Sequence, residues 1–222
     1  MTRQTSARLA GSAYLLYIAV AFPSMMLFGR ANAGAGGAER LARFAAHAQD
    51  LQLAAFLSLL GCFAALALAV GLYGATRNED HEIATLALAC RVGEGILGCG
   101  IAIAMLAILW LTTAQGPTAP DPAQAGGLVM LLVKARGWSE SASATFFAVG
   151  STLFCWLLLR GRMIPTPLAW LGLLSSAALA ALIPLELVGV MNGNVTEWMF
   201  LPMGGFEMVA GFWLLIKGVA PA

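Results

Sequence analysis

Six long apolar segments constrain the fold of this chain more than any other feature. Each reaches the roughly 20 residues that an α-helix needs to cross the hydrocarbon core of a bilayer. They lie at residues 9–28, 47–72, 83–111, 139–159, 167–190 and 198–216. Backbone polar groups in lipid must be satisfied within a helix or a closed barrel, and the alternation of a barrel strand is absent here. The sequence therefore predicts an all-α, polytopic integral membrane bundle of about six transmembrane helices.

Composition supports a membrane protein. Of the 222 residues, 60% are hydrophobic and 10% are charged, against about 25% charged residues in a typical soluble domain. Spans and short connections take up nearly the whole chain, so we expect a single membrane domain over residues 1–222, with the lipid bilayer as its partner. The net charge of +1 provides no basic field, and no nucleic-acid partner is predicted.

The N-terminal segment has features of a secretory signal, with Arg3 and Arg8 before an apolar stretch. That stretch is longer than a usual signal core of about 7–15 residues, so we interpret it as a retained first helix. With the N-terminus inside, Lys and Arg near the span ends number six inside and five outside. Because the inner loops are short and compactly basic, we expect both termini to be cytoplasmic.

The connections between the spans are punctuated by glycine and proline. Residues 32–37 are predicted to form a flexible turn, and residues 160–162 a tight hairpin between two antiparallel neighbours. The longest connection runs over residues 112–138. Its later part, residues 127–136, is apolar and then basic, which predicts an amphipathic turn along the membrane interface.

Cysteine and histidine often mark metal or redox sites, but their spacing in this chain does not favour either chemistry. Cys62, Cys90, Cys99 and Cys155 all lie inside apolar segments and form no C-x-x-C pair, so we interpret them as small buried hydrophobes. The two histidines lack ligand spacing. Neither a metal nor a cofactor is predicted.

Three charged residues lie inside the predicted spans, namely Arg91, Glu94 and Glu207. A charge at a helix centre costs about 2.5–3.5 kcal/mol, so such residues are candidates for function. Arg91 and Glu94 share a helix face, which predicts an intrahelical ion pair; alternatively Arg91 snorkels to the inner interface. Gly204 and Gly211 flank Glu207 on one face, which predicts a close helix neighbour and a carboxyl turned to the interior.

Glu94 and Glu207 fall at similar depths if the third and sixth spans are neighbours. One arginine and two glutamates leave one excess negative charge, and we predict that Glu207 carries a proton at neutral pH. Such a proton can be donated, relayed or shared with a ligand. The structural alternative is that the three charges only hold the two helices in register.

Other residues are weaker candidates. A polar set nearer the outer leaflet comprises His47, Asp50 and Glu186, which we expect either to line the mouth of a cavity or to serve interfacial solvation and capping. Aromatic side chains are candidates for steadying a cationic intermediate, or else for ordinary packing. The candidates for substrate binding are therefore His47, Asp50, Glu186, Tyr14, Trp156 and Phe206.

Several segments resemble a bacterial membrane-protein family known as domain of unknown function 4386. They are Arg8–Gly11 with Tyr14, Arg91–Glu94, Gly161–Pro165 with Leu168–Gly172, and Gly204–Glu207 with Trp213–Gly218. The resemblance covers nearly the whole chain and implies a multi-pass protein of the bacterial cytoplasmic membrane. It implies no reaction, because the family carries no established activity.

Three classes of function remain open. In the first, Glu207 or Glu94, with Arg91, performs acid catalysis on an isoprenoid-like, lipid-soluble substrate, as a cyclase or isomerase similar in architecture to membrane terpene cyclases. In the second, the glutamates relay protons in a small-molecule transporter that is expected to oligomerise. In the third, the chain is a non-catalytic assembly partner with a small-residue seam at Gly95–Cys99. Under the first class, we expect an apolar small molecule as the partner.

Overall fold

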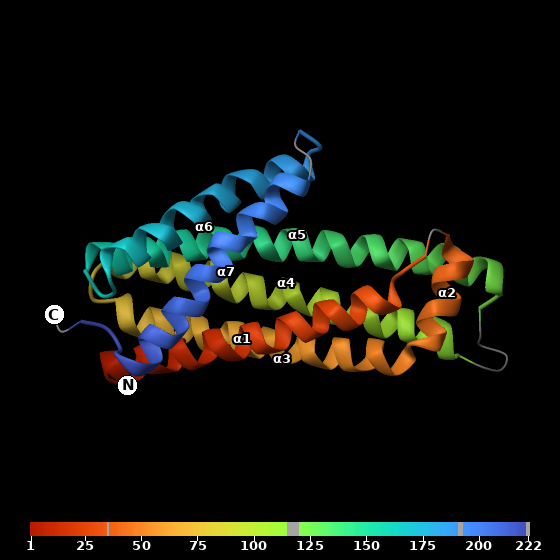
Figure 1. Ribbon diagram of the computed structural model, residues 1–222, viewed down its shortest axis with the longest axis horizontal. Helices are drawn as coiled ribbons and strands as arrows, with labels where there is room; N and C mark the ends of the chain where they lie inside the picture. Colours follow the sequence, from red (N-terminus) through yellow and green to blue (C-terminus); the bar gives the residue numbers. More distant parts are fainter. Residues whose placement is uncertain (35, 115–119, 191–192, 221–222) are drawn as a thin grey trace. The chain divides into compact units, whose positions relative to one another are not determined.

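The computed structural model describes residues 1–34, 36–114, 120–190 and 193–220, and this part of the chain is helical without strands (Figure 1). Six of its helices are long and apolar enough to cross a membrane, which confirms the prediction of a polytopic helical membrane protein. The helices are α1 (Arg3–Ala31), α2 (Gly37–Ala46), α3 (Ala48–Thr76), α4 (His81–Thr113), α5 (Pro122–Arg160), α6 (Thr166–Leu187) and α7 (Gly193–Ile216).

Two connections differ from the sequence prediction. The turn predicted at residues 32–37 includes residue 35, which lies outside the described residues. At Gly37 the chain enters α2, a ten-residue amphipathic helix that the sequence interpretation missed. The loop predicted over residues 112–138, with its interfacial turn at 127–136, is wrong in its later part, because α5 is continuous from Pro122 onward. Proline is well suited to the first turn of a helix, and an Arg136–Glu140 ion pair one turn apart supports the helix further along.

The chain divides into two compact units. Unit 1 comprises residues 1–18, 63–96 and 141–222, and unit 2 comprises residues 19–62 and 97–140. Helices α1, α3, α4 and α5 each contribute residues to both units, whereas α6 and α7 belong to unit 1 alone. The expectation of a single membrane domain over the whole chain stays a prediction.

Small residues bring the helices of unit 1 close together. A Cβ at Gly71 of α3 would lie 2.7 Å from the backbone nitrogen of Ala10 of α1, and a Cβ at Gly11 would collide with the backbone of α7 at Leu215. Helix α1 is therefore held between α3 and α7 at van der Waals distance from both backbones. Such glycine contacts are typical of helix packing in membranes, where apolar burial alone provides little driving force.

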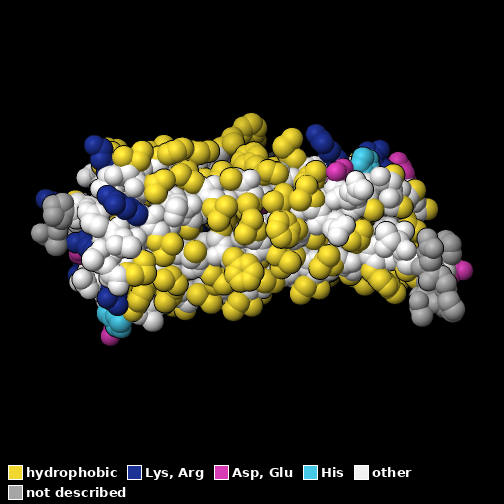
Figure 2. Space-filling view, turned by 90° about the horizontal axis from the view of Figure 1, so that it is seen from below, with side chains coloured by type: hydrophobic (Ala, Val, Ile, Leu, Met, Phe, Trp, Pro, Cys, Tyr) yellow, Lys and Arg dark blue, Asp and Glu magenta, His cyan; other side chains and the backbone are white. Residues whose placement is uncertain are grey.

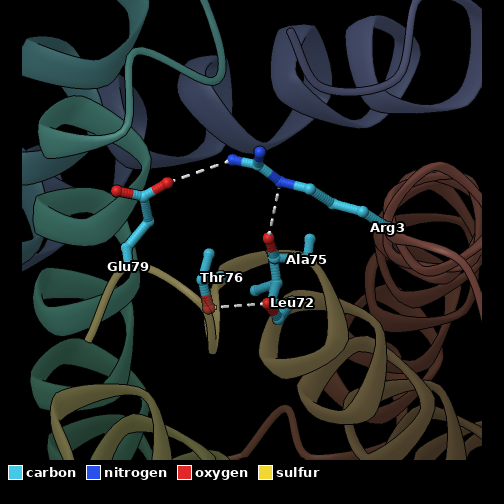
Figure 3. Close-up of polar contacts among 5 residues, drawn as sticks. All are labelled: Arg3, Leu72, Ala75, Thr76 and Glu79. Carbon is cyan, nitrogen blue, oxygen red and sulfur yellow. Dashed lines mark hydrogen bonds and ion pairs between the residues drawn. The ribbon is translucent and has the colours of Figure 1, made fainter. Parts of the chain in front are cut away.

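Arg3 fastens the start of α1 to the end of α3 (Figure 3). Its Nε donates to the carbonyl oxygen of Ala75 at 3.1 Å, and its Nη2 lies 3.3 Å from Oε1 of Glu79. The Ala75 carbonyl is one of the last four of α3, which have no partner inside the helix. Arg3 thus satisfies an orphan carbonyl and places a positive charge at the negative end of the helix dipole.

Unit 2 has its own core around Phe28 and Phe44. The two rings lie 5.9 Å apart, so the apolar face of α2 is anchored to α1 by Phe44. Ser24 donates to the carbonyl oxygen of Ala54 at 2.9 Å, a polar contact between α1 and α3. The amphipathic α2 exists because this core buries its one large aromatic side chain.

Large hydrophobic side chains are exposed along the spans, as expected for lipid-facing surfaces. Figure 2 shows hydrophobic side chains over much of one face. Within unit 1, Gln4 joins the start of α1 to the C-terminal tail, since its Nε2 donates to the carbonyl oxygen of Val219 at 2.7 Å.

Candidate functional site

Arg91 and Glu94 form a buried ion pair on α4. Nη1 of Arg91 lies 2.9 Å from Oε2 of Glu94, and the two side chains are 0% and 3% exposed. This geometry confirms the predicted intrahelical pair and excludes snorkelling of Arg91 to the interface. A pair that is removed from water this completely recovers its desolvation cost only if hydrogen bonds satisfy its remaining groups.

Helix α5 supplies the cavity for the guanidinium group. A Cβ at Gly150 would lie 2.9 Å from Cγ of Arg91, so glycine leaves space for the arginine stem. Ser151 accepts a hydrogen bond from Nη1 at 3.3 Å, and the ring of Phe147 lies 4.9 Å from the guanidinium carbon. A cation–π contact in a desolvated place contributes about 2 kcal/mol.

Glu207 enters the same region from α7. Its side chain is 6% exposed, and the charges of Arg91 and Glu94 both act on its carboxyl group. The acids of α4 and α7 therefore converge in the interior of unit 1. Their convergence agrees with the depths calculated from the sequence.

Helix α1 closes the site with two tyrosines. Tyr14 is 2% exposed and meets the Phe206 ring of α7 edge-on, with the centroids 6.5 Å apart. Glu207, Arg91 and Glu94 all interact electrostatically with Tyr14, and Tyr17 lies beside the Glu94 carboxylate. Three helices, α1, α4 and α7, thus meet at one polar centre beside α5. We call this centre the acid cluster: Arg91, Glu94, Glu207, Tyr14 and Tyr17.

The glycines that flank Glu207 behave differently from each other. A Cβ at Gly211 would lie 3.1 Å from Leu15 and 3.2 Å from Tyr14, so the predicted close neighbour is α1. The same expectation for Gly204 is wrong, because a Cβ there would meet nothing within 4 Å. Gly204 is exposed and leaves the surface of α7 open one turn before Glu207.

Several polar atoms of the acid cluster lack partners within the described residues. Apart from the Glu94 carboxyl oxygens, which lie beside Arg91 and Tyr17, they are Nε and Nη2 of Arg91 and Oε1 of Glu207, all buried. A buried polar group without a hydrogen bond costs about 1–3 kcal/mol, and more if it is charged. Groups of this kind usually have an explanation in function or in a ligand. Two donors and one carboxyl oxygen are therefore available here to a bound molecule.

The structure places the other predicted site residues outside this cluster. Trp156 is 44% exposed and is directed to the outside of α5. Glu186 is half-buried near the end of α6. His47 and Asp50 belong to unit 2, where Nδ1 of the histidine lies 3.0 Å from the carboxylate. That these three polar residues line one mouth stays a prediction.

Sequence reasoning missed Gly150 and Ser151. Both lie on the face of α5 that carries Phe147 and Phe154, at the i, i+3, i+4 and i+7 spacing of one helix side. A serine and a glycine on an otherwise apolar face are a weak sign of a polar contact. Among the described residues, no group of three or more His, Cys, Asp and Glu side chains is placed to hold a metal ion.

Fold and site together define a multi-pass helical membrane protein with a charged cluster enclosed in its interior. The family model described as Domain of unknown function (DUF4386) matches residues 9–218. The chain therefore belongs to this family, in agreement with the resemblance drawn from its motifs. No curated protein and no solved structure matches the chain significantly.

Proposed function

We propose that the acid cluster binds a lipid-soluble small molecule and protonates it through Glu207. The unpartnered Oε1 of Glu207, buried beside the Arg91–Glu94 pair, is the observation that carries this proposal. One positive and two negative charges leave an excess that a proton on Glu207 cancels. A buried carboxylic acid held in an apolar site is a competent general acid.

The surrounding groups indicate the class of substrate. Free N–H donors of Arg91 suit one oxygen atom on the ligand, such as that of an epoxide or carbonyl. Phe147, Phe206 and Tyr14 provide aromatic faces and edges around the charged groups, which suits a cationic intermediate. An isoprenoid-like chain with one oxygen function and alkene bonds meets both requirements.

Access from the lipid is supported by Gly204. Side chains on a helix lean toward its N-terminus, so the Glu207 carboxyl lies over the turn that contains Gly204. That residue is exposed, with no heavy atom within 4 Å of a Cβ built on it. A substrate dissolved in the bilayer reaches the carboxyl beside this glycine without crossing water.

The proposed reaction is an isomerisation, so substrate and product contain the same atoms. The Glu207 O–H bond breaks as its proton adds to an alkene carbon or an epoxide oxygen of the substrate. The carbocation accepts an alkene electron pair and closes a ring. A neighbouring C–H bond then breaks, and its proton returns to a carboxylate of the acid cluster. No oxidant or reductant is required.

Conversion of defined probes tests this proposal. The purified protein in mixed micelles is incubated with geranylgeraniol or its terminal epoxide, and products of unchanged mass are separated by chromatography. We expect isomers from the wild type, none from Glu207→Gln, and normal conversion by Glu82→Gln, an exposed control on α4. No conversion by the wild type, or equal conversion by Glu207→Gln, would contradict an acid role.

Proton-coupled transport is the second candidate. It is favoured by the acids on two helices, α4 and α7, which interact electrostatically within one buried cluster and suit a relay. In liposomes, we expect substrate-dependent proton flux that disappears when Glu94 and Glu207 are both replaced by glutamine. The third candidate, an assembly partner, has less support, because Gly95 of its small-residue seam is buried and Cys99 is half-buried. Homo-oligomerisation, the bacterial inner membrane and cytoplasmic termini remain proposals.

A further inference from the structure

A cleft of about 420 Å³ opens in unit 1 where α5, α6 and α7 reach their ends. Its lining is mostly apolar, with three polar or basic side chains. The residues on which the argument depends are Gln4, Arg162, Pro165, Trp213, Lys217 and Val219. None belongs to the acid cluster, so the cleft is a separate feature.

Among the described residues, the two cations of the cleft have no carboxylate partner. Two other arginines at this end of unit 1 are paired, Arg3 with Glu79 at 3.3 Å and Arg160 with Asp80 at 3.2 Å. Within the described residues, no ion pair or side-chain hydrogen bond is made by Arg162 or Lys217. The cleft therefore presents two positive charges that the described part of the chain does not neutralise.

The walls of the cleft are held in place by the C-terminal tail. Gln4 donates to the Val219 carbonyl at 2.7 Å and accepts from the Val219 amide at 3.2 Å, while the Ala220 amide donates to Met163 at 3.0 Å. Gly218 turns the chain with a φ of +72°, and a Cβ there would collide with Gln4. The cleft is thus formed in advance of any ligand.

Arg162 is held in an unusual backbone conformation. Its φ of 48° lies in the left-handed region, which costs a non-glycine residue about 1 kcal/mol or more. Glycine would fit this position without strain. Arg162 nevertheless occupies this position on the rim of the cleft, and none of the described residues forms an ion pair with it. This combination points to a function of its charge.

The position of the cleft relative to the spans identifies the occupant. Lys217 follows the last residue of the α7 span directly, and Arg162 lies between the α5 and α6 spans. Trp213, one turn inside, suits the boundary between hydrocarbon and headgroups. Basic pockets between transmembrane helices at this level bind phosphate-bearing lipid headgroups.

We propose that this cleft binds the phosphate of an anionic phospholipid between Arg162 and Lys217, with an acyl chain along Trp213. The larger, apolar part of the lining favours a lipid over free phosphate, which offers nothing for Trp213 to contact. An anionic headgroup also matches the two unneutralised charges.

Native mass spectrometry in nanodiscs containing phosphatidylglycerol and phosphatidylcholine tests the assignment. We expect the wild type to retain phosphatidylglycerol selectively. Removing one cation, by Arg162→Gly or Lys217→Gln, weakens retention roughly fivefold, and Arg162→Lys keeps most of it. Arg162→Gly separates binding from folding, because glycine is suited to the left-handed conformation. Arg77→Gln is the matched control, an exposed cation at the same end but outside the cleft.

Two outcomes overturn the proposal. Equal retention of phosphatidylglycerol by the wild type and both cleft variants would show that the cations do not select the lipid. Quenching of Trp fluorescence by inorganic phosphate in lipid-free micelles, lost in Arg162→Gly, would assign the cleft to free phosphate instead.

Discussion

The two units contain the same local motif in two different environments. In unit 1, Arg91 pairs with Glu94 at 2.9 Å and lies 4.9 Å from the Phe147 ring. In unit 2, Arg136 pairs with Glu140 at 3.0 Å and lies 4.0 Å from the Phe28 ring. The first pair is 0% and 3% exposed, whereas the second is 13% and 53% exposed.

This difference shows why one pair is a candidate site and the other is not. Glu140 keeps half of its surface outside the unit, so its charge is screened and its pair contributes about 0–1 kcal/mol. Glu94 is almost completely buried, and it shares its surroundings with a second carboxyl group, that of Glu207. Stability does not require this arrangement, since buried pairs are weak stabilisers.

The largest expected contrast comes from removing each arginine. Arg91→Leu leaves the Glu94 charge buried without its counterion and should lower the free energy of unfolding by about 3–5 kcal/mol. Arg136→Leu should cost about 0.5–2 kcal/mol, because it removes a screened ion pair and a partly exposed cation–π contact. Unfolding by SDS in mixed micelles measures both. Equal losses would mean that burial does not distinguish the two pairs.

Two glycines of α5 provide the next contrast. In Gly150→Ala the new methyl group meets the Arg91 stem at 2.9 Å, and overpacking of this kind costs about 1–3 kcal/mol. In Gly127→Ala the methyl group meets nothing within 4 Å, and alanine should stabilise the helix by up to about 1 kcal/mol. In the same SDS titration, we expect Gly150→Ala to lower the free energy of unfolding and Gly127→Ala to raise it. A Gly150→Ala variant with unchanged stability would count against a tight arginine cavity.

Replacing each phenylalanine by leucine gives a smaller contrast. Phe147→Leu keeps an apolar side chain but removes the ring from a fully desolvated guanidinium, at a cost of about 2 kcal/mol. Phe28→Leu should lose about 0.5–1 kcal/mol of cation–π energy, because Arg136 is partly exposed. The ordering is checked by thermal melting of both variants beside the wild type, and a reversed order would remove the cation–π argument for unit 1.

The smallest expected effect concerns salt. Glu140→Gln should change stability by less than about 1 kcal/mol, and that difference should vanish at high salt because the exposed pair is screened. Glu94→Gln should give a difference from wild type that salt leaves unchanged. A salt-sensitive Glu94→Gln would show that water reaches the acid cluster.

The spans were predictable because long apolar segments in a chain with few charges permit little else. The start of α5 was not, since Lys134, Arg136 and Glu140 interrupt its hydropathy and Pro117 and Pro120 suggest a loop. What makes this stretch helical is an intrahelical ion pair and the contact of Arg136 with Phe28, which lies about 100 positions earlier in the chain. Helix α2 was missed for a similar reason, because its Phe44 is stabilised by Phe28.

The acid cluster was predictable in part. Charges at span centres identified Arg91, Glu94 and Glu207, because their cost in lipid makes them conspicuous. The contribution of α5 was not predictable, since Gly150 acts only through the space that it leaves for an arginine on α4. Trp156 and Phe206 were equivalent candidates in the sequence, and only packing separates the exposed ring from the buried one.

Native mass spectrometry of the gently purified protein tests the central claim most directly. The wild type is compared with Glu94→Gln and Glu207→Gln, and with Glu82→Gln as control. If the unpartnered atoms of the acid cluster hold a ligand, the wild type and the control carry a discrete apolar adduct that is lost or altered in the other two variants. Bulk phospholipid bound equally by all four proteins, with no discrete adduct, would contradict the account.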